Sequence, residues 1–191
     1  GTRMLNILPL SEENMEADDV IGTIVTQWLT HTQGDCVIVS KDKDMTQLVN
    51  DRVTLWDGKE SEMGRDQVIT KMGVSPEQVI DLLGLAGDTS DNIPGIPGIG
   101  IKTAAKLLQE YSTLDDLLKN AHQIKGKRGD NLVNFADQAI LSRTLARIKC
   151  DIDMSITMHD LYYTGPNMLQ MTQWMEHYNF HSLIKNIQKR P

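Results

Sequence analysis

Apolar residues in the first third of the chain follow two different periodicities. Between Ala17 and Thr32 they recur at helical spacing, which predicts an amphipathic helix with one buried face. Cys36 to Ser40 is a short continuous apolar run rich in β-branched residues, typical of a strand buried on both faces of a parallel sheet. Further strands are predicted over Arg3 to Leu8 and Val53 to Trp56. The order of strand, helix and strand predicts a βαβ unit.

From Asp66 onward the pattern becomes predominantly helical, with glycines and prolines interrupting it. The clearest loop is Tyr162 to Asn167, which precedes a last pair of helices near residues 168–187. We therefore predict the α/β fold class, with a partial parallel sheet and flanking helices in residues 1–75. A helical region follows in residues 76–150 and a helical appendage in residues 151–191.

Length and composition are those of an ordinary globular protein. With 191 residues, of which 40% are hydrophobic, the chain can bury one sizeable core. It has no run of about 18 uncharged apolar residues and no signal-peptide pattern, so we expect a soluble, cytoplasmic protein without a membrane partner. Its two cysteines, Cys36 and Cys150, form no C-x-x-C pair, which argues against a disulfide framework or a zinc ribbon.

The net charge of −7 conceals an uneven distribution. Residues 1–101 carry 7 basic against 17 acidic residues, a net charge of −10, whereas residues 102–149 carry 9 against 5, a net charge of +4. A protein that binds cations at one place and phosphates at another shows such a division, and so does one with solvated helix faces of either sign. The charge pattern alone leaves both interpretations open.

Acidic residues gather in three short clusters at the predicted ends of core elements. One cluster opens the first helix, one follows the Cys36 to Ser40 strand, and one follows a predicted helix that ends at Gly87. Helix dipoles, caps and turns explain any single cluster, but three together favour a common site beyond the carboxyl ends of the strands. The seven candidate metal ligands are Glu16, Asp18, Asp19, Asp42, Asp44, Asp88 and Asp91.

Carboxylates gathered at one place repel one another unless cations neutralise them, and hard oxygen ligands suit Mg²⁺ or Mn²⁺. Two such ions about 3.5 to 4 Å apart activate a water and stabilise the leaving oxygen in phosphodiester hydrolysis. No Ser-His-Asp or Cys-His pattern competes, because the five histidines are scattered. The clusters therefore predict two or more divalent ions and nuclease chemistry. We assign the catalytic role to Asp18, Asp19, Asp42 and Asp44.

The segment from Gly95 to Leu108 predicts two helices joined by a tight glycine hairpin. It is not a Walker A loop, because Lys102 does not directly follow Gly100. Gly98 and Gly100 permit the turn, and the first amides of the next helix can then point at a phosphate, assisted by Lys102, Thr103 and Lys106. Such a hairpin holds the backbone of duplex DNA without reading its sequence.

Two alternatives remain for these basic segments. A glycine-rich connection between packed helices also explains the hairpin, and a solvated surface explains the basic residues that follow it. Secondary candidates for a phosphate track are Lys125, Lys127, Arg128, Arg143, Arg147 and Lys149, with the last three expected along one helix.

Three motifs carry a family resemblance: Glu16-Ala17-Asp18-Asp19, Ser40-Lys41-Asp42-Lys43-Asp44 with Gln47-Leu48-Val49, and the run from Gly87 to Gly100. With them the chain resembles the 5′ nuclease domain of bacterial DNA polymerase I and related flap endonucleases, which combine a PIN-like core with a helix-hairpin-helix region. The likeness weakens after about Asp151. It implies a metal-dependent 5′-3′ exonuclease and flap endonuclease that hydrolyses DNA at 5′ ends or flaps in replication and repair.

The resemblance also implies roles for individual residues. Glu16, Asp18 and Asp19 would hold one metal ion directly or through water, Asp42 and Asp44 would bridge or support the pair, and Asp88 and Asp91 would serve the second ion. The segment around Gly98 and Gly100 would bind the duplex backbone, in some relatives with a monovalent cation such as K⁺.

Family members carry roughly one hundred further N-terminal residues, about the size of a domain. Arg3 to Leu8 matches a later strand of the family. We therefore expect a fragment, a chain completed by a separate N-terminal nuclease segment, or a protein that has lost activity, and we expect it to bind metal poorly and to cut weakly. The alternatives are a non-catalytic module for structured DNA and the accessory half of a split nuclease, which would expose an apolar sheet edge. A polymerase domain is a further candidate partner.

Overall fold

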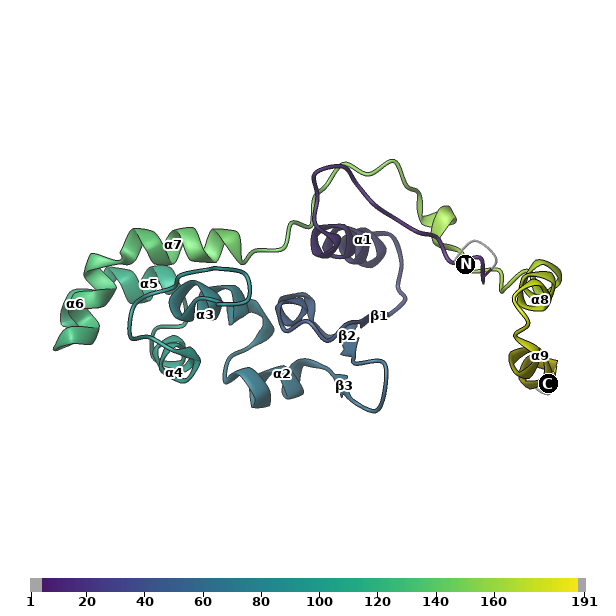
Figure 1. Cartoon of the computed structure of the whole chain (residues 1–191). Coiled ribbons are helices and arrows are strands. Elements are labelled where there is room, and N and C mark those ends of the chain that lie inside the picture. The colour runs from purple at the N-terminus through teal and green to yellow at the C-terminus, as the bar shows by residue number, and fades with distance from the viewer. Residues whose placement is uncertain (1–4, 189–191) are drawn as a thin grey trace.

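The computed structural model describes residues 5–188 and folds them into a small sheet followed by a mainly helical region (Figure 1). Within these residues the sheet has the order β1-β2-β3. β1 (Cys36–Val39) pairs in parallel with β2 (Val53–Trp56), and β2 pairs in antiparallel fashion with β3 (Glu62–Met63). The α/β fold class is confirmed, with a mixed sheet in place of a purely parallel one.

α1 (Ala17–His31) precedes β1, and a 3₁₀ helix over Asp44–Leu48 forms the crossover from β1 to β2. In the register, Cys36 lies opposite Val53 and Ile38 lies opposite Leu55. The predicted helix is therefore present as α1, and the two predicted strands that follow it are present as β1 and β2. The bounds of β2 are those predicted from the sequence.

The prediction that the first of these strands is buried on both faces was wrong for the described chain. Ile38 is buried, but the alternate positions Val37 and Val39 are 55% and 63% exposed. Among residues 5–188, β1 also has no strand paired to its outer edge. Because side chains alternate across a strand, one apolar face of β1 packs in the core and the other remains open to solvent.

The strand predicted over Arg3 to Leu8 is absent from its described part, residues 5–8, while residues 3 and 4 lie outside the described residues. Asn6 has a positive φ of 52°, and its side-chain amide donates to the carbonyl oxygen of Gly165 at 2.6 Å and to Thr164 Oγ1 at 3.3 Å. These bonds hold the N-terminal segment against a distant loop instead of the sheet, so the predicted βαβ unit lacks its first strand.

The second half of the chain is mainly helical, as predicted from its helical pattern and from the glycines and prolines that interrupt it. Gly73, in the left-handed region with φ of 77°, ends the first of these helices. α3 lies at the centre of the region and packs against α4, α5 and α7. The bounds are α2 (Arg65–Met72), α3 (Val79–Ala86), α4 (Ile101–Tyr111), α5 (Leu114–Lys119), α6 (Lys127–Asn134), α7 (Ala136–Leu145), α8 (Met168–His177) and α9 (His181–Gln188).

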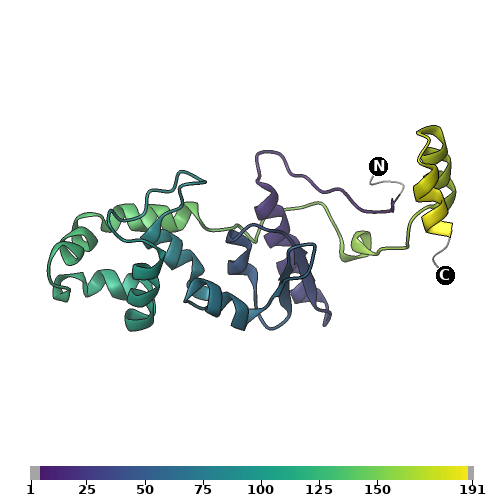
Figure 2. The ribbon, with the colours of Figure 1, turned by 60° about the horizontal axis from the view of Figure 1, so that its bottom comes forward.

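The predicted final helical pair is confirmed as α8 and α9, which lie at the end of the molecule opposite α4 to α6 in both views (Figures 1 and 2). Between α7 and α8 the chain is largely extended, with a short 3₁₀ helix at Met158–Leu161. The rest of the described chain shares one hydrophobic core that runs from Val25 of α1 through Leu83 of α3 to Leu132 of α6. Sheet and helical region are thus packed together.

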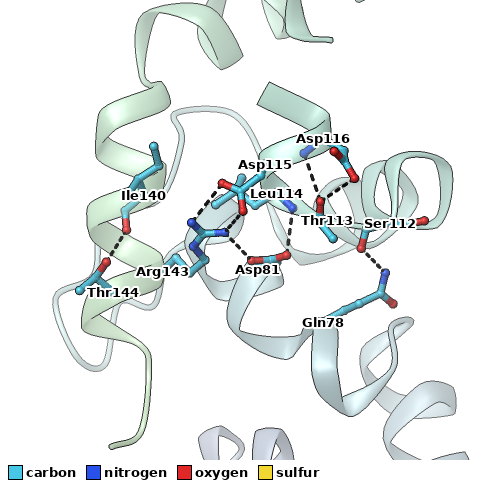
Figure 3. Close-up of polar contacts among 10 residues, drawn as sticks. All are labelled: Gln78, Asp81, Ser112, Thr113, Leu114, Asp115, Asp116, Ile140, Arg143 and Thr144. Carbon is cyan, nitrogen blue, oxygen red and sulfur yellow. Dashed lines mark hydrogen bonds and ion pairs between the residues drawn. The ribbon is translucent and has the colours of Figure 1, made fainter. Parts of the chain in front are cut away.

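A partly buried ion pair fastens α7 to this core (Figure 3). Arg143 donates to Asp81 of α3 at 3.3 Å and makes two bonds to Asp115 of α5, at 2.9 and 3.2 Å. The second oxygen of Asp81 accepts the amide of Leu114 at 2.9 Å. At Gly84, an added Cβ would lie 2.9 Å from Cβ of Arg143, so glycine allows α3 and α7 to approach this closely.

Replacing Arg143 with methionine should destabilise the fold by about 2 to 3 kcal/mol, because it leaves the buried Asp81 carboxylate without a counter-charge. Asp115→Asn is the matched control. The Asp115 carboxylate is exposed, so its loss should cost less than about 1 kcal/mol. Urea unfolding of both variants measures the difference, and equal losses would show that burial of Asp81 does not govern the interaction.

Candidate metal centre and nucleic-acid interface

A cavity of about 310 Å³ lies beyond the carboxyl end of β1, and carboxylates from three segments face it. Glu16 and the first turn of α1 supply one side, the segment after β1 a second, and the loop after α3 a third. Leu145 to Ile148 close the cavity behind α7. Six of the seven predicted ligands line it: Glu16, Asp18, Asp19, Asp42, Asp44 and Asp91.

The start of α1 is tied to the segment that follows α7. Oδ1 of Asp19 accepts a hydrogen bond from the Lys149 amide at 2.8 Å. One turn further along α1, a Cβ added at Gly22 would lie 2.7 Å from Cγ2 of Ile148, so only glycine permits this close crossing. Within residues 5–188, the side chains of Glu16 and Asp18 make no such bond, and both residues line the cavity.

Gln47 holds the opposite side of the cavity in place. Its side-chain amide donates to the carbonyl oxygen of Ala146 at 3.0 Å and its oxygen accepts the amide of Ile148 at 3.0 Å. On the same 3₁₀ segment, the Asp44 amide donates to Oδ1 of Asp42 at 3.0 Å. The chain between Asp42 and Gln47 is therefore fixed both locally and to the segment behind the site.

A closed loop presents Asp88 and Asp91. The Asp88 and Ile93 backbones bond each other twice, at 2.9 and 2.7 Å. At the base of the loop Gly87 and Gly95 lie back to back, with φ of 71° and 59°, and a Cβ on either would collide with the backbone of the other segment. Both glycines are thus required for the turn that brings Asp91 to the cavity and holds Asp88 beside Asp44 and Asp91.

Asp44, Asp88 and Asp91 each offer an oxygen within 4.8 Å of the other two. Asp44 is 9% exposed, and its Oδ1 is buried without a hydrogen-bond partner among the described residues. Asp88 Oδ1 accepts bonds from the Ser90 amide and hydroxyl at 2.9 and 2.5 Å. Its Oδ2 forms an ion pair with Lys43 Nζ at 2.5 Å.

The glycine hairpin lies between α3 and α4. Gly98 has φ of 78° and needs glycine for its conformation, whereas Gly100, with φ of −92°, is the N-cap of α4 and has free space around it. The hairpin is braced by Asn131 of α6, whose side chain donates to the Pro97 carbonyl oxygen at 2.8 Å. Beside it, a cavity of about 330 Å³ is lined by Lys102, Thr103, Lys106, Leu107, Glu110 and Arg128.

Two family models match adjacent parts of the chain. Residues 2–73 match the family model for the 5′-3′ exonuclease N-terminal resolvase-like domain, and residues 74–169 match that for the 5′-3′ exonuclease C-terminal SAM fold. The chain belongs to the 5′-3′ exonuclease family.

Relatives and solved structures agree. The chain is 42% identical over 181 residues to DNA polymerase I of Rhizobium leguminosarum, covering 92% of this chain and 18% of that protein. It is 35% identical to the 5′-3′ exonuclease of Buchnera aphidicola, covering 92% and 64%. A bacteriophage T5 flap endonuclease in complex with DNA and metal ions matches with a TM-score of 0.65 and 25% identity, covering 74% and 52%. The chain thus spans about a fifth of the polymerase I relatives and about two thirds of the exonuclease.

Within the residues that the structure describes, no helix has both the length and the apolar character needed to cross a bilayer.

Burial and charge repulsion shift the pKa values of the carboxylates at the acidic site of this exonuclease-family chain. Burial, then the neighbouring Asp42, Asp88 and Asp91, raise the pKa of Asp44 to about 6. Burial, then Asp42 and Glu16, raise the pKa of Asp18. Burial also raises the pKa of Asp88, but hydrogen bonds from Lys43 and Ser90 outweigh it and hold that pKa below its usual value.

This donor set fits a divalent cation. All the candidate ligands are carboxylates, the buried Oδ1 of Asp44 has no hydrogen-bond partner among the described residues, and burial together with the neighbouring carboxylates raises the pKa values of Asp18 and Asp44. A divalent ion at this position would supply what the described residues do not.

The basic residues considered as secondary candidates for phosphate binding lie in different surroundings in the structure. Arg128 joins the hairpin cavity, but Arg143 is engaged with Asp81 and Asp115 and does not extend a phosphate track. α7 ends at Leu145, so Arg147 and Lys149 lie beyond the helix that was expected to carry them, and Arg147 lines the acidic cavity. The carboxyl partners of Arg143 are distant in sequence, which is why the pattern alone did not reveal its role.

Two polar residues with clear positions were given no role in the sequence interpretation. Gln47 joins the segment behind the cavity, and Lys43 pairs with Asp88. The signal for Lys43 was present, since it is the basic residue between two candidate ligands. Gln47 bonds residues about 100 positions away, and no local signal indicates that.

The raised pKa of Asp44 gives a pH-dependent prediction for the metal-free protein. Below about pH 4, near its ordinary value of 3.8, the carboxyl is protonated in both folded and unfolded chains. As the pH rises towards 6, only the unfolded chain releases the proton freely, so stability is lost and stays lost above pH 6. Asp44→Asn should therefore stabilise the metal-free protein at pH 8 by about 2 kcal/mol, or roughly 4 to 8 °C, and not at pH 4.

Thermal unfolding in the presence of a chelator at both pH values tests this. Asp35→Asn, at an exposed position outside the cavity, is the control and should leave the midpoint unchanged. A pH-independent effect of Asp44→Asn would contradict the proposed cause.

Proposed function

We propose that the chain is the metal-binding and DNA-holding part of a 5′-3′ exonuclease and flap endonuclease, hydrolysing DNA phosphodiester bonds at 5′ ends or flaps in replication and repair. The observation that carries this proposal is the convergence of carboxylates from three segments around one cavity, where a buried Asp44 oxygen has no hydrogen-bond partner in the described part of the chain. Such a site has a use in phosphodiester hydrolysis and little use in a purely structural role.

In this proposal, two or more Mg²⁺ or Mn²⁺ ions are held by the seven carboxylates. Asp44, Asp88 and Asp91, which lie within one ion's reach of each other, hold one ion, and Glu16, Asp18 and Asp19 hold another with Asp42 between. Bound ions of this kind supply Lewis acidity and lower the pKa of a water. The T5 flap endonuclease, a 25% identical structural relative, has been solved with DNA and metal ions, which supports the assignment.

The protein's own contribution is to hold these oxygens in place before catalysis. Asp18, Asp19, Asp42 and Asp44, the proposed catalytic residues, come from elements that Gln47 and the Lys149 amide tie together. The scissile phosphate would then meet a rigid set of oxygens rather than mobile side chains. Catalysis of this kind relies on such preorganisation.

DNA would be held at the hairpin. The first amides of α4, beside the exposed Lys102 and Lys106 and the Thr103 hydroxyl, can bind a phosphate of the duplex backbone, and Arg128 adds a charge from α6. Carbonyl groups near Gly98 and Gly100 could also accommodate K⁺. Because Asp91 and Gly98 belong to one continuous connection between α3 and α4, a duplex held here has a defined position relative to the acidic cavity.

The length of the polymerase I relatives suggests partners. We propose that the nuclease works with a polymerase domain or with a separate N-terminal nuclease segment, in the cytoplasm of a bacterial cell and associated with DNA. The open edge and exposed face of β1 are compatible with a further segment that completes the sheet.

Cleavage should depend on the acidic cavity. In Mn²⁺, Asp88→Ala should reduce cleavage of a 5′-flap DNA by at least about 100-fold, because losing a direct ligand costs more than the 10- to 100-fold loss from an outer-shell partner. The exposed Asp66→Ala serves as the control and should cut like the parent chain. Retained DNA binding without cleavage by the parent chain would instead favour the non-catalytic alternative.

DNA affinity should depend on the hairpin. A Lys102→Ala, Lys106→Ala double variant should weaken binding to duplex DNA and reduce the slope of log affinity against log salt by about 2, near one per lost phosphate contact. Lys59→Ala removes an exposed charge from the β2–β3 connection and should leave the slope unchanged. Fluorescence anisotropy across a salt series, in chelator, measures both. An unchanged slope in the double variant would remove the hairpin from the interface.

A further inference from the structure

The Lys43 side chain places a positive charge of the protein itself at the candidate metal centre. It lies between Asp42 and Asp44 in the chain, and its ammonium is 2.5 Å from Oδ2 of Asp88. The Asp88 side chain is only 1% exposed, so water provides little compensation for its charge. Hydrogen bonding to Asp88 raises the pKa of Lys43 despite its partial burial, which keeps the ammonium charged.

The bonding of Asp88 leaves one oxygen for a cation. Oδ1 is already occupied by the amide and hydroxyl of Ser90. Oδ2 accepts no other hydrogen bond from the described residues, so it is the atom that remains for a metal ion and the atom that the ammonium contacts. Asp44 Oδ1, the other buried oxygen of the triad, has no partner at all among these residues.

A divalent ion and the ammonium compete for Asp88 Oδ2. Metal–oxygen distances for Mg²⁺ are about 2.0 to 2.1 Å, so the two cations would lie within a few ångströms of each other beside a buried carboxylate, where like charges repel more strongly than in bulk water. Binding of the ion at Asp44, Asp88 and Asp91 therefore favours movement of the ammonium away from Asp88.

The structure has room for that movement. Lys43 also lines a neighbouring cavity of about 350 Å³, whose other charged lining residues are Lys41, Asp42, Asp57 and Lys71. The flexible four-carbon stem of lysine can carry its charge from Asp88 towards this cavity without a change in the backbone. Asp57 would then provide a counter-charge at the new position.

We propose that Lys43 is a positioning residue whose ammonium takes the place of the divalent ion at Asp44, Asp88 and Asp91. In the metal-free protein it holds Asp88 in place, and it is displaced when the divalent ion binds. This inference rests on the proposed metal centre. It makes metal affinity a balance between two cations that compete for one oxygen.

Mn²⁺ binding measured by the loss of the free-ion electron paramagnetic resonance signal tests the proposal without DNA or catalysis. Lys43→Met should bind Mn²⁺ roughly tenfold more tightly than the parent chain, because the metal no longer has to break a charge-assisted hydrogen bond. Its metal-free melting temperature should fall, because Asp88 loses its partner. Lys43→Arg, which keeps a cation, should restore affinity towards that of the parent chain.

Lys59→Met is the control, since it removes the same charge from an exposed lysine that lines neither cavity and has no ion pair within the described chain. It should tighten Mn²⁺ binding much less than Lys43→Met. Equal tightening by the two variants would show a general charge effect and overturn the displacement, as would unchanged or weaker binding by Lys43→Met. Failure of every protein, the parent included, to bind Mn²⁺ would overturn the metal centre itself and this proposal with it.

Discussion

The repulsion among seven carboxylates is the constraint on which the rest of this structure depends. Burial first, and then the neighbouring carboxylates, raise the pKa values of Asp18 and Asp44. The start of α1, the segment after β1 and the loop that carries Asp88 and Asp91 bring carboxylates together, of which Asp19, Asp44 and Asp88 are buried.

Backbone contacts far apart in sequence maintain this arrangement. The chain leaving α7 crosses behind the cavity, where Asp19 accepts its Lys149 amide and Gln47 bonds Ala146 and Ile148. Arg143 fastens α7 itself to α3 and α5, so the crossing segment starts from a fixed point. The helical region thus has a structural part in the acidic site as well as its proposed contact with DNA.

The fold places the acidic and basic parts of the chain around two different cavities. The acidic first half supplies most of the carboxylates around the cavity that is the proposed cation site, and the basic segment supplies the surface beside the hairpin where Lys102, Lys106 and Arg128 meet. Asp91 of the acidic cavity and the glycine hairpin both belong to the connection from α3 to α4. In the proposed function, a nucleic acid would be held by its phosphates at the hairpin while a neighbouring phosphate approaches the acidic cavity, without the acidic surface repelling the whole molecule.

The sequence by itself determined the features that depend on neighbouring residues: the periodicity of α1, the β-branched runs of β1 and β2, the glycine punctuation of the helices and the acidic clusters at element ends. It also indicated that those clusters converge, because strand and helix ends meet at one edge of such folds. Only the tertiary structure decided that residues 5–8 run along a distant loop, that Val37 and Val39 face solvent, that Arg143 serves an ion pair and that Lys43 neutralises Asp88. Each of these depends on which group lies opposite in space, and burial and charge compensation are properties of such distant pairs that local pattern does not encode.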